Sequence, residues 1–336
     1  MNRLVLGNAA YRKLFGICKG HMTDEQAQLQ DGLVHAGWTI AGPSFNPYKE
    51  RYLPAHASII EASDVRTILD KAKFDTVFIQ DPRDMQAESG GCFDKWTNFY
   101  GIGALKHYSA YKVVSFKDAA VAIDYQRDFA ASVGASALAT YYHRDSIKLT
   151  SVWAEDYIHI RHYHCVDADY IKTLNLYKDR RRGLVSGHTS PFFYPLRHEV
   201  VRRAHSWNID VQPHPGWNNH GCRVPEYLEL LTHYKVHVAT CTRYGHALRK
   251  IIESVCCGCA CVTNLPEYDC LPVIDDWLIR IPLHAEINQV REAIDKAESE
   301  WNQEQAIARA EAACDYYDFK ADAKRLDQSI RDAIQH

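Results

Sequence analysis

Three charged side chains in the C-terminal half have residue types and a spacing that suit a phosphorylated ligand. Arg249, Lys250 and Glu253 lie within five positions of a segment with helical periodicity. Residues three apart on a helix share one face, so Lys250 and Glu253 should project together. Such a cation can bind a diphosphate, and such a carboxylate can accept hydrogen bonds from ribose hydroxyls. An ion pair on a solvated helix face has the same spacing, so both interpretations stay open on spacing alone.

Four cysteines follow this segment directly. Cys256, Cys257, Cys259 and Cys261 stand within six positions, which could indicate a metal site or a disulfide. Neighbouring helical positions diverge by about 100°, so a shared four-thiolate site would be awkward. The predicted helix ends at Gly258, and we expect the cysteines to serve as small buried residues. The odd total of eleven cysteines indicates reduced thiols rather than a disulfide framework.

Length and composition favour a globular protein of two domains. The chain has 336 residues, 46% hydrophobic content and a net charge of −3. No apolar run reaches the roughly 18 residues that a membrane span needs. The N-terminal residues predict a first strand rather than an export signal, so we expect a cytoplasmic protein. The acidic balance gives no global attraction to nucleic acid, although Arg180, Arg181 and Arg182 form a local basic run.

Short apolar runs alternate with helical patterns along the whole chain, which predicts an α/β fold with parallel sheets. In the first half, we expect strands at residues 4–7, 38–41, 74–79, 111–116, 137–142 and 157–160. In the second half, we expect strands at residues 183–186, 209–212, 236–240, 260–263 and 278–281. The helices expected to matter most are 194–206, 224–232, 247–257, 285–314 and 319–334.

The boundaries follow from this alternation. We expect an N-terminal, acceptor-side Rossmann-like domain at residues 1–172 and a C-terminal nucleotide-sugar-binding domain at residues 178–318. A charged linker near residues 170–182 joins them. The last helix, at residues 319–336, is expected to pack back on the N-terminal domain.

Two segments of the second domain resemble the donor-binding block of GT-B glycosyltransferases. The first is Glu253-Ser-Val-Cys-Cys-Gly258 with the strand after it, similar to that family's E-A-x-A-C-G pattern. The second is the strand end Val185-Ser-Gly-His188 followed by Tyr194-Pro-Leu-Arg197. The specific motifs cover about residues 183–281, and the architecture covers the whole chain. The resemblance implies two Rossmann-like domains with parallel sheets facing across a cleft, and a nucleotide diphosphate sugar as donor, most simply a UDP-sugar.

The resemblance also implies roles for individual residues. Glu253 would bind the donor ribose, and Arg197, Arg249 and Lys250 would bind the diphosphate without an obligatory metal. The full predicted donor site comprises Gly187, His188, Arg197, Tyr244, His246, Arg249, Lys250 and Glu253. Many retaining members carry a second glutamate eight residues before the first, where this chain has Gly245. This departure leaves inverting chemistry open.

An inverting enzyme needs a general base from the first domain. Asp118 directly follows a predicted strand, in a placement distantly similar to the catalytic aspartate of the T-even phage DNA β-glucosyltransferase. Asp81 and Asp84 follow the preceding strand, and His21 lies in the loop after the first strand. Each could equally cap a helix or stabilise a turn.

The histidines His159, His162 and His164 have a spacing that roughly suits a metal, although positions along a strand are the simpler explanation. We therefore predict no metal site. The leading hypothesis is a glycosyltransferase that acts on a hydroxyl of a glycan or glycoconjugate. A phage-type transferase acting on a hydroxymethylated DNA base, a sugar-nucleotide epimerase and a non-catalytic sugar-nucleotide binder are the alternatives.

Overall fold

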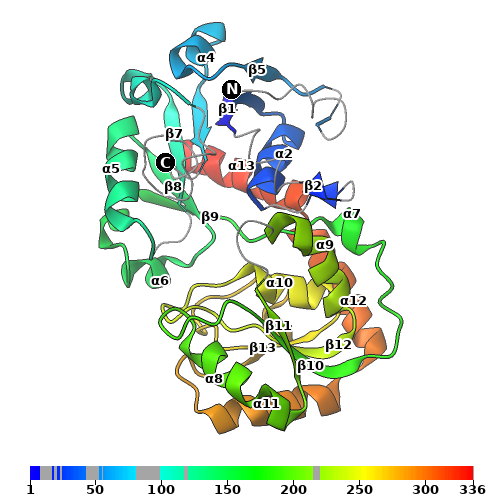
Figure 1. Ribbon diagram of the computed structural model, residues 1–336. Coiled ribbons are helices and arrows are strands. Elements are labelled where there is room, and N and C mark those ends of the chain that lie inside the picture. Colours follow the sequence, from blue (N-terminus) through cyan, green and yellow to red (C-terminus); the bar gives the residue numbers. More distant parts are fainter. Residues whose placement is uncertain are drawn as a thin grey trace. The chain divides into compact units, whose positions relative to one another are not determined.

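The chain forms two compact units in the computed structural model (Figure 1). Unit 1 comprises Met1–Ile17, Asp24–Tyr163 and Phe319–His336, and unit 2 comprises Cys18–Thr23 and His164–Asp318. The structure describes residues 1–7, 17–18, 21–22, 25–42, 53–54, 56–80, 99–116, 120–214 and 220–335. At 17–18, 21–22, 25–27 and 220–223 it describes the backbone only. Among the described residues, no helix combines the length and apolar character needed to cross a membrane.

Unit 1 is built on a seven-stranded sheet in which all the described strand pairs are parallel. Its spatial order is β5 (Ile59–Glu61), β4 (Thr39–Gly42), β1 (Arg3–Leu6), β6 (Thr76–Ile79), β7 (Tyr111–Phe116), β8 (Ala137–Thr140) and β9 (Ile158–Arg161). The chain direction through the sheet reverses between β1 and β6, as in doubly wound folds. A separate pair of short strands is β2 (Ile17–Cys18) and β3 (His21–Met22).

Helices cover both faces of this sheet because its strands are apolar on both faces. Leu4 and Leu6 of β1 belong to a buried cluster with α4 (Val65–Lys71) and α5 (Ile123–Val133). The intervening Val5 belongs to the opposite cluster, with α2 (Glu25–His35) and α13 (Phe319–Gln335). The last helix, red in Figure 1, packs beside the blue α2. Shorter segments are η4 (Ile102–His107), α6 (Arg144–Lys148) and η5 (Val152–Asp156).

Unit 2 contains a five-stranded sheet that is also parallel in every pair. Its order is β11 (Asp210–Pro213), β10 (Arg181–Gly187), β12 (Tyr234–Val238), β13 (Ala260–Thr263) and β14 (Leu278–Arg280). β10 is the first strand of this sheet in chain order, and it lies between the second strand, β11, and the third, β12. The topological switch point is therefore between β10 and β12, where open α/β sheets bind ligands beyond the carboxyl ends of the strands.

The two faces of the second sheet have different chemical characters. One face packs Val185, Val236 and Val262 against α8 (Pro195–Arg203) and α11 (Ile287–Glu300). The other face, which carries His237, lies toward α9 (His220–Leu231) and α10 (Arg249–Cys256). The unit is completed by α7 (Ala168–Ile171), η6 (Ala204–Trp207), η8 (Asp275–Trp277) and α12 (Gln303–Tyr317).

The predicted fold class is confirmed, since both units are parallel α/β sheets with helices. The single helix predicted at residues 285–314 is wrong. Trp301 is extended at φ −65° and ψ 125°, and its indole N–H donates to the Gly258 carbonyl at 3.2 Å. The Asn302 side chain then accepts from the backbone N–H of Gln305 and caps a new helix. A tertiary contact and a cap thus override a continuous helical pattern.

Two further boundaries differ from prediction. The helix expected at residues 224–232 begins at His220, so Pro225 lies inside α9. The charged segment expected as a linker contains α7 and the start of β10, and its arginines are used within unit 2. Arg180 is buried and donates to the carbonyls of Leu176, Tyr234 and Cys257. Arg181 pairs with Asp210, and Arg182 pairs with Asp295 and Glu298.

Candidate functional site

The predicted donor residues of unit 2 lie on three segments around the switch point of its sheet. Gly187 ends β10, and His188 begins the loop that leads into α8, where Arg197 lies. The loop of residues 239–248 follows β12, and α10 begins at Arg249. Because β10 and β12 are adjacent and parallel, their carboxyl ends bring these segments to one edge.

Gly187 permits the close approach of two cations. Its φ is +107°, and a Cβ there would lie 2.9 Å from Lys250 Cε and 3.0 Å from Arg197 Nη1. A larger residue would be strained in its backbone and would displace the long side chains on either side. The glycine therefore brings the Arg197 guanidinium and the Lys250 side chain to the same strand end.

Arg197 fixes the two loops relative to each other. The side chain is only 1% exposed, and it donates to the carbonyl of His188 at 3.1 Å and to that of Thr240 at 2.6 Å. Its guanidinium also lies 4.3 Å from the centre of the Tyr194 ring. Burial lowers the pKa of Arg197 from its ordinary value. In the described part of the chain no carboxylate pairs with it, so its charge faces the strand end uncompensated.

Lys250 brings a second cation without a paired carboxylate among the described residues. Its ammonium lies 4.1 Å from the centre of the Tyr227 ring. The residue as a whole is half-buried, but its ammonium group is enclosed. Burial, which Glu253 opposes and the charges of Arg197 and Arg249 reinforce, lowers the pKa of Lys250 to about 8. A bound anion would stabilise the charged form of Lys250, which burial and the neighbouring cations disfavour.

Glu253 pairs with Arg249 rather than with Lys250. The Arg249 Nε to Glu253 Oε1 distance is 3.1 Å, and the two side chains are 12% and 5% exposed. The face of α10 that carries them is therefore buried and not the solvated surface of the alternative interpretation. Glu253 lies in the middle of the buried helix α10, and one of its carboxylate oxygens already pairs with Arg249.

The remaining predicted donor residues are placed differently from one another. His188 is exposed, and its ring lies 6.3 Å from that of Tyr194 and 6.2 Å from that of His214. Tyr244 is half-buried and His246 is buried, with 5.8 Å between their ring centres. The Thr242 hydroxyl accepts from the backbone N–H groups of both, which folds the loop back on itself.

Gly245 lies at the position where the resemblance would place a second glutamate. Its φ is +73°, and a Cβ there would lie 2.9 Å from Pro266 Cγ and 3.0 Å from the Tyr268 hydroxyl. A glutamate at this position would need a strained backbone and a displaced neighbouring loop. This loop is therefore built for a glycine.

The sequence did not identify two other residues at this edge. His214 follows β11 at the carboxyl edge, and burial with the charges of Lys250, His188 and Arg197 lowers its pKa to about 4. Tyr227 comes from α9 and lies under the Lys250 ammonium. A histidine directly after a strand is a detectable signal, whereas a tyrosine in an amphipathic helix gives none.

The predicted general base lies outside what the structure describes. Asp118, Asp81 and Asp84 are outside the described residues, and of His21 only the backbone in β3 is described. The described parts of β6 and β7 end at Ile79 and Phe116, so the assignment of the base stays a prediction.

Each of the four clustered cysteines is buried in the interior of unit 2. Cys256, Cys257 and Cys261 are 0% exposed and Cys259 is 5% exposed. Burial raises the pKa of Cys259 and of Cys261 to about 12. No group of three histidine, cysteine, aspartate or glutamate side chains within the described ranges is arranged to hold a metal ion. These thiols are free and fill the interior around α10 and β13.

The burial of these thiols predicts slow alkylation. At pH 8 a thiol of pKa about 12 is thiolate in about one molecule in ten thousand, and only the thiolate reacts. Exposed Cys270 should therefore be alkylated rapidly by iodoacetamide, while Cys259 and Cys261 should react only in urea. Peptide mass spectrometry over time would measure this. Native labelling of Cys261 as fast as that of Cys270 would contradict the described packing.

The three histidines with metal-like spacing, His159, His162 and His164, each have different neighbours. His159 lies in β9, and burial lowers its pKa to about 4. The His162 ring lies 4.1 Å from the Tyr141 ring, and His164 Nε2 is 3.1 Å from the Ala247 carbonyl.

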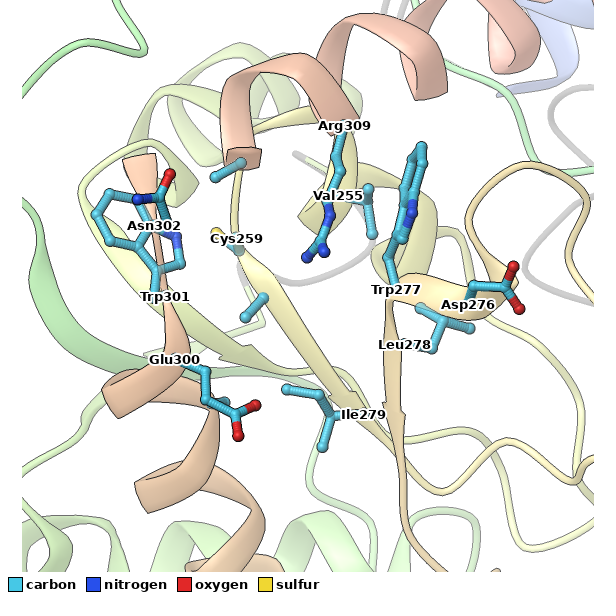
Figure 2. Close-up of a pocket in the computed structure, with 13 residues that line it drawn as sticks. Val255, Cys259, Asp276, Trp277, Leu278, Ile279, Glu300, Trp301, Asn302 and Arg309 are labelled. Carbon is cyan, nitrogen blue, oxygen red and sulfur yellow. The ribbon is translucent and has the colours of Figure 1, made fainter. Parts of the chain in front are cut away.

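A hollow of about 180 Å³ lies elsewhere in unit 2 and does not coincide with the donor loops (Figure 2). It opens at the amino ends of β13 and β14, the opposite edge of the sheet, between Trp277, Trp301 and Arg309. Its charged lining consists of Arg309 with Asp276 and Glu300. With two carboxylates for one cation, the hollow does not suit a diphosphate, so the candidate site remains at the switch point.

Comparisons with known proteins identify the fold. No family model and no curated protein matches the sequence. Sucrose-phosphate synthase from Thermosynechococcus elongatus aligns over 100% of both chains with a TM-score of 0.59 and 10% identity. AviGT4, a glycosyltransferase involved in avilamycin A biosynthesis, aligns over 100% of this chain and 98% of its own, with a TM-score of 0.53 and 13% identity. HepE from Anabaena, in complex with UDP, aligns over 100% of both chains with a TM-score of 0.50 and 10% identity. The chain has the GT-B fold of such glycosyltransferases.

Proposed function

We propose that this chain is a glycosyltransferase that moves a sugar from a nucleoside diphosphate sugar, a UDP-sugar in the simplest case, to a hydroxyl acceptor. One observation carries the proposal. Arg197 and Lys250, two enclosed cations without a paired carboxylate in the described residues, meet at Gly187 on the switch point of a GT-B sheet. A diphosphate is the ligand whose charge and size suit this arrangement. The UDP complexes of a similarly folded protein support uracil as the base.

The donor would bind along the carboxyl edge of the sheet in unit 2. The diphosphate would contact Lys250, Arg197 and the neighbouring backbone at His188. Glu253 would accept hydrogen bonds from the ribose hydroxyls with its second oxygen, while Arg249 keeps its charge balanced. His188 and His214 stand beside the cations and would contact phosphate or sugar.

The transfer would expel the nucleoside diphosphate from the anomeric carbon. The acceptor oxygen forms a bond to that carbon as its proton passes to a base, and the bond from carbon to phosphate oxygen breaks. The electron pair leaves with the diphosphate, whose growing charge the two cations stabilise, so we propose that the step needs no metal. Asp118 is the proposed base, with Asp81 and His21 as the rivals. Many retaining members of the family that the sequence resembles carry a glutamate at the position of Gly245, where a side chain would be crowded here, and this supports the proposed inverting course.

The acceptor proposed here is a saccharide or glycoconjugate rather than DNA. The basic run that suggested nucleic acid is engaged within unit 2: Arg180 binds backbone carbonyls, and Arg181 and Arg182 bind carboxylates. Arg180 is therefore not available to a phosphate, and neighbouring carboxylates offset the charges of Arg181 and Arg182, which weakens the case for a DNA-binding surface here.

A thermal-shift panel tests the proposal directly. Ligands that bind only the folded state raise the melting temperature, by a free energy of about 2.7 kcal/mol at a hundred times Kd. UDP, GDP, ADP and their glucose conjugates should be compared with UMP, GMP, AMP and free glucose as controls. At least one diphosphate should stabilise the protein more than its monophosphate does. No shift with any diphosphate would refute the donor site. Turnover of the stabilising sugar nucleotide without any acceptor would favour an epimerase.

The lowered pKa of Lys250 predicts that diphosphate binding weakens in mild alkali. Below its pKa of about 8, Lys250 is a cation both before and after binding. A bound diphosphate raises that pKa, so above pH 8 binding must take up a proton. Affinity should therefore fall by up to about tenfold per pH unit above 8. Isothermal titration with UDP from pH 7 to 9.5 would measure the slope, and a Lys250→Met variant should lack it. A flat wild-type profile would contradict this role for Lys250.

A further inference from the structure

A closed ring of polar contacts joins Ser186, His237, Ser254, Lys250 and Tyr227, and of these residues only Lys250 has a role in the proposed transfer. Ser186 directly precedes Gly187, and Ser254 directly follows Glu253. His237 of β12 stands between them and is 0% exposed. Its Nε2 lies 2.9 Å from Ser186 Oγ, and its Nδ1 lies 2.5 Å from Ser254 Oγ. One imidazole thus joins the strand end that carries Gly187 to the helix that carries Lys250 and Glu253.

The chain of hydrogen bonds continues at both ends and returns to one residue. Ser254 Oγ donates to the Lys250 backbone carbonyl, four residues earlier in α10. Ser186 Oγ also lies 2.9 Å from the Tyr227 hydroxyl, and the Tyr227 ring lies 4.1 Å from the Lys250 ammonium. Lys250 is therefore contacted twice. Ser254 binds its backbone carbonyl, and the Tyr227 ring contacts its ammonium group.

The proton positions in this chain follow from the donors and acceptors present. A carbonyl oxygen only accepts, so the single Ser254 proton is committed to Lys250. His237 must then donate its Nδ1 proton to Ser254 Oγ, and in a neutral ring its Nε2 accepts from Ser186. Ser186 in turn accepts from the Tyr227 hydroxyl. Burial, with the charges of Lys250 and Arg197, holds the pKa of His237 well below its ordinary value, in agreement with a neutral ring.

We propose that His237 is a positioning residue. It holds the Lys250 ammonium and the Glu253 carboxylate at the positions relative to Gly187 that binding of the donor diphosphate requires. The inference rests on the proposed function, because this positioning matters only if a nucleoside diphosphate sugar binds at these residues. The buried imidazole of His237 spans the gap between two elements that each carry donor groups. Small displacements of such groups change binding and rate strongly, so the ring beneath them has a measurable effect.

Four proteins test the proposal: the wild type and the variants His237→Phe, His237→Asn and Val236→Ala. Phenylalanine fills the same space without hydrogen bonds, and asparagine keeps a donor near the position of Nδ1. Val236 is equally buried on the same strand, but it faces α8 and α11, so its truncation loosens the sheet without touching the ring. The Kd for UDP would be measured by isothermal titration on folded protein, with melting temperatures recorded alongside.

We expect His237→Phe to raise the Kd for UDP about tenfold or more, and His237→Asn and Val236→Ala to raise it less than about threefold. Unchanged UDP affinity in a folded His237→Phe would overturn the proposal. So would an equal loss in Val236→Ala, since general loosening would then explain both. If the wild type binds no nucleoside diphosphate, the proposed function fails instead.

The state of the imidazole gives a second readout, which does not depend on binding. Nitrogen NMR of histidine-labelled protein should show His237 neutral at pH 7 with the proton on Nδ1, and Ser254→Ala should shift that signal. A proton on Nε2 would reverse the chain and contradict the assignment.

Discussion

Replacing Lys250 with methionine is expected to raise the Kd for UDP by about 10-fold to 100-fold at pH 7 while the protein stays folded. The lysine ammonium faces the strand end with no paired carboxylate among the described residues, so its charge is available to the diphosphate. A charge-assisted hydrogen bond contributes about 1.5–3 kcal/mol, and 1.4 kcal/mol corresponds to tenfold in Kd. Methionine keeps the apolar stem that packs against Gly187 and Tyr227.

The same variant separates binding from stability. Removing an enclosed cation that lacks a partner lifts a desolvation penalty, so the melting temperature of the unliganded variant should be equal or higher. Isothermal titration and a thermal melt on one preparation would test both statements. An unchanged Kd would show that the diphosphate does not reach Lys250. Lys235→Met, on a cation that lies 5.9 Å from the Trp301 ring, is the matched control and should leave UDP affinity unchanged.

Glu253→Ala is the companion experiment for the ribose. Strongly weakened donor binding is expected, because the variant loses an acceptor for the ribose hydroxyls and removes the carboxylate that pairs with Arg249. UDP should lose more affinity than inorganic pyrophosphate, which has no ribose. Equal losses for the two ligands would point to a general disturbance of α10.

The fold could be predicted because each apolar run indicates one strand without reference to the rest of the chain. Leu4, Val5 and Leu6 alternate between two buried clusters, and a segment apolar at every position is typical of a strand covered on both faces. The end of each strand can also be predicted from its own sequence. Once β10 and β12 pair in parallel, Gly187 must therefore lie near the segment that follows β12. The switch point itself did not follow from the sequence, because strand order is a property of long-range pairing.

Side-chain partners were not predictable from spacing. Glu253 is three residues from Lys250 and four from Arg249, and both spacings bring residues together on a helix. The structure selects Arg249, because Lys250 turns toward Gly187 and Tyr227 instead. The ring around His237 draws on several elements far apart in the chain. Its only local signal is a polar residue inside the apolar strand that contains Val236 and Val238.

Asp327→Ala is expected to have the largest effect on stability. In unit 1 this carboxylate of α13 is 8% exposed and receives three donors from other positions. Arg3 of β1 pairs with it, the Trp38 indole N–H donates at 2.8 Å, and Arg331 Nε lies at 3.0 Å. Alanine would leave the Arg3 side chain, 11% exposed, with an uncompensated charge and the buried Trp38 with an unpaired donor.

Removing one partner of a buried ion pair typically costs about 3–5 kcal/mol, a large share of the roughly 5–15 kcal/mol that stabilises a domain. Detachment of α13 should precede global unfolding, because Asp327 is the polar anchor of that helix on β1. Native-state proteolysis would detect early cleavage near the C-terminus, and a thermal melt would show a lower first transition. Asp332→Ala, at an exposed position of the same helix, should change stability by less than about 0.5 kcal/mol. Equal resistance of the Asp327 and Asp332 variants to protease would mean that apolar packing of Ala323, Leu326 and Ile330 alone holds α13 in place.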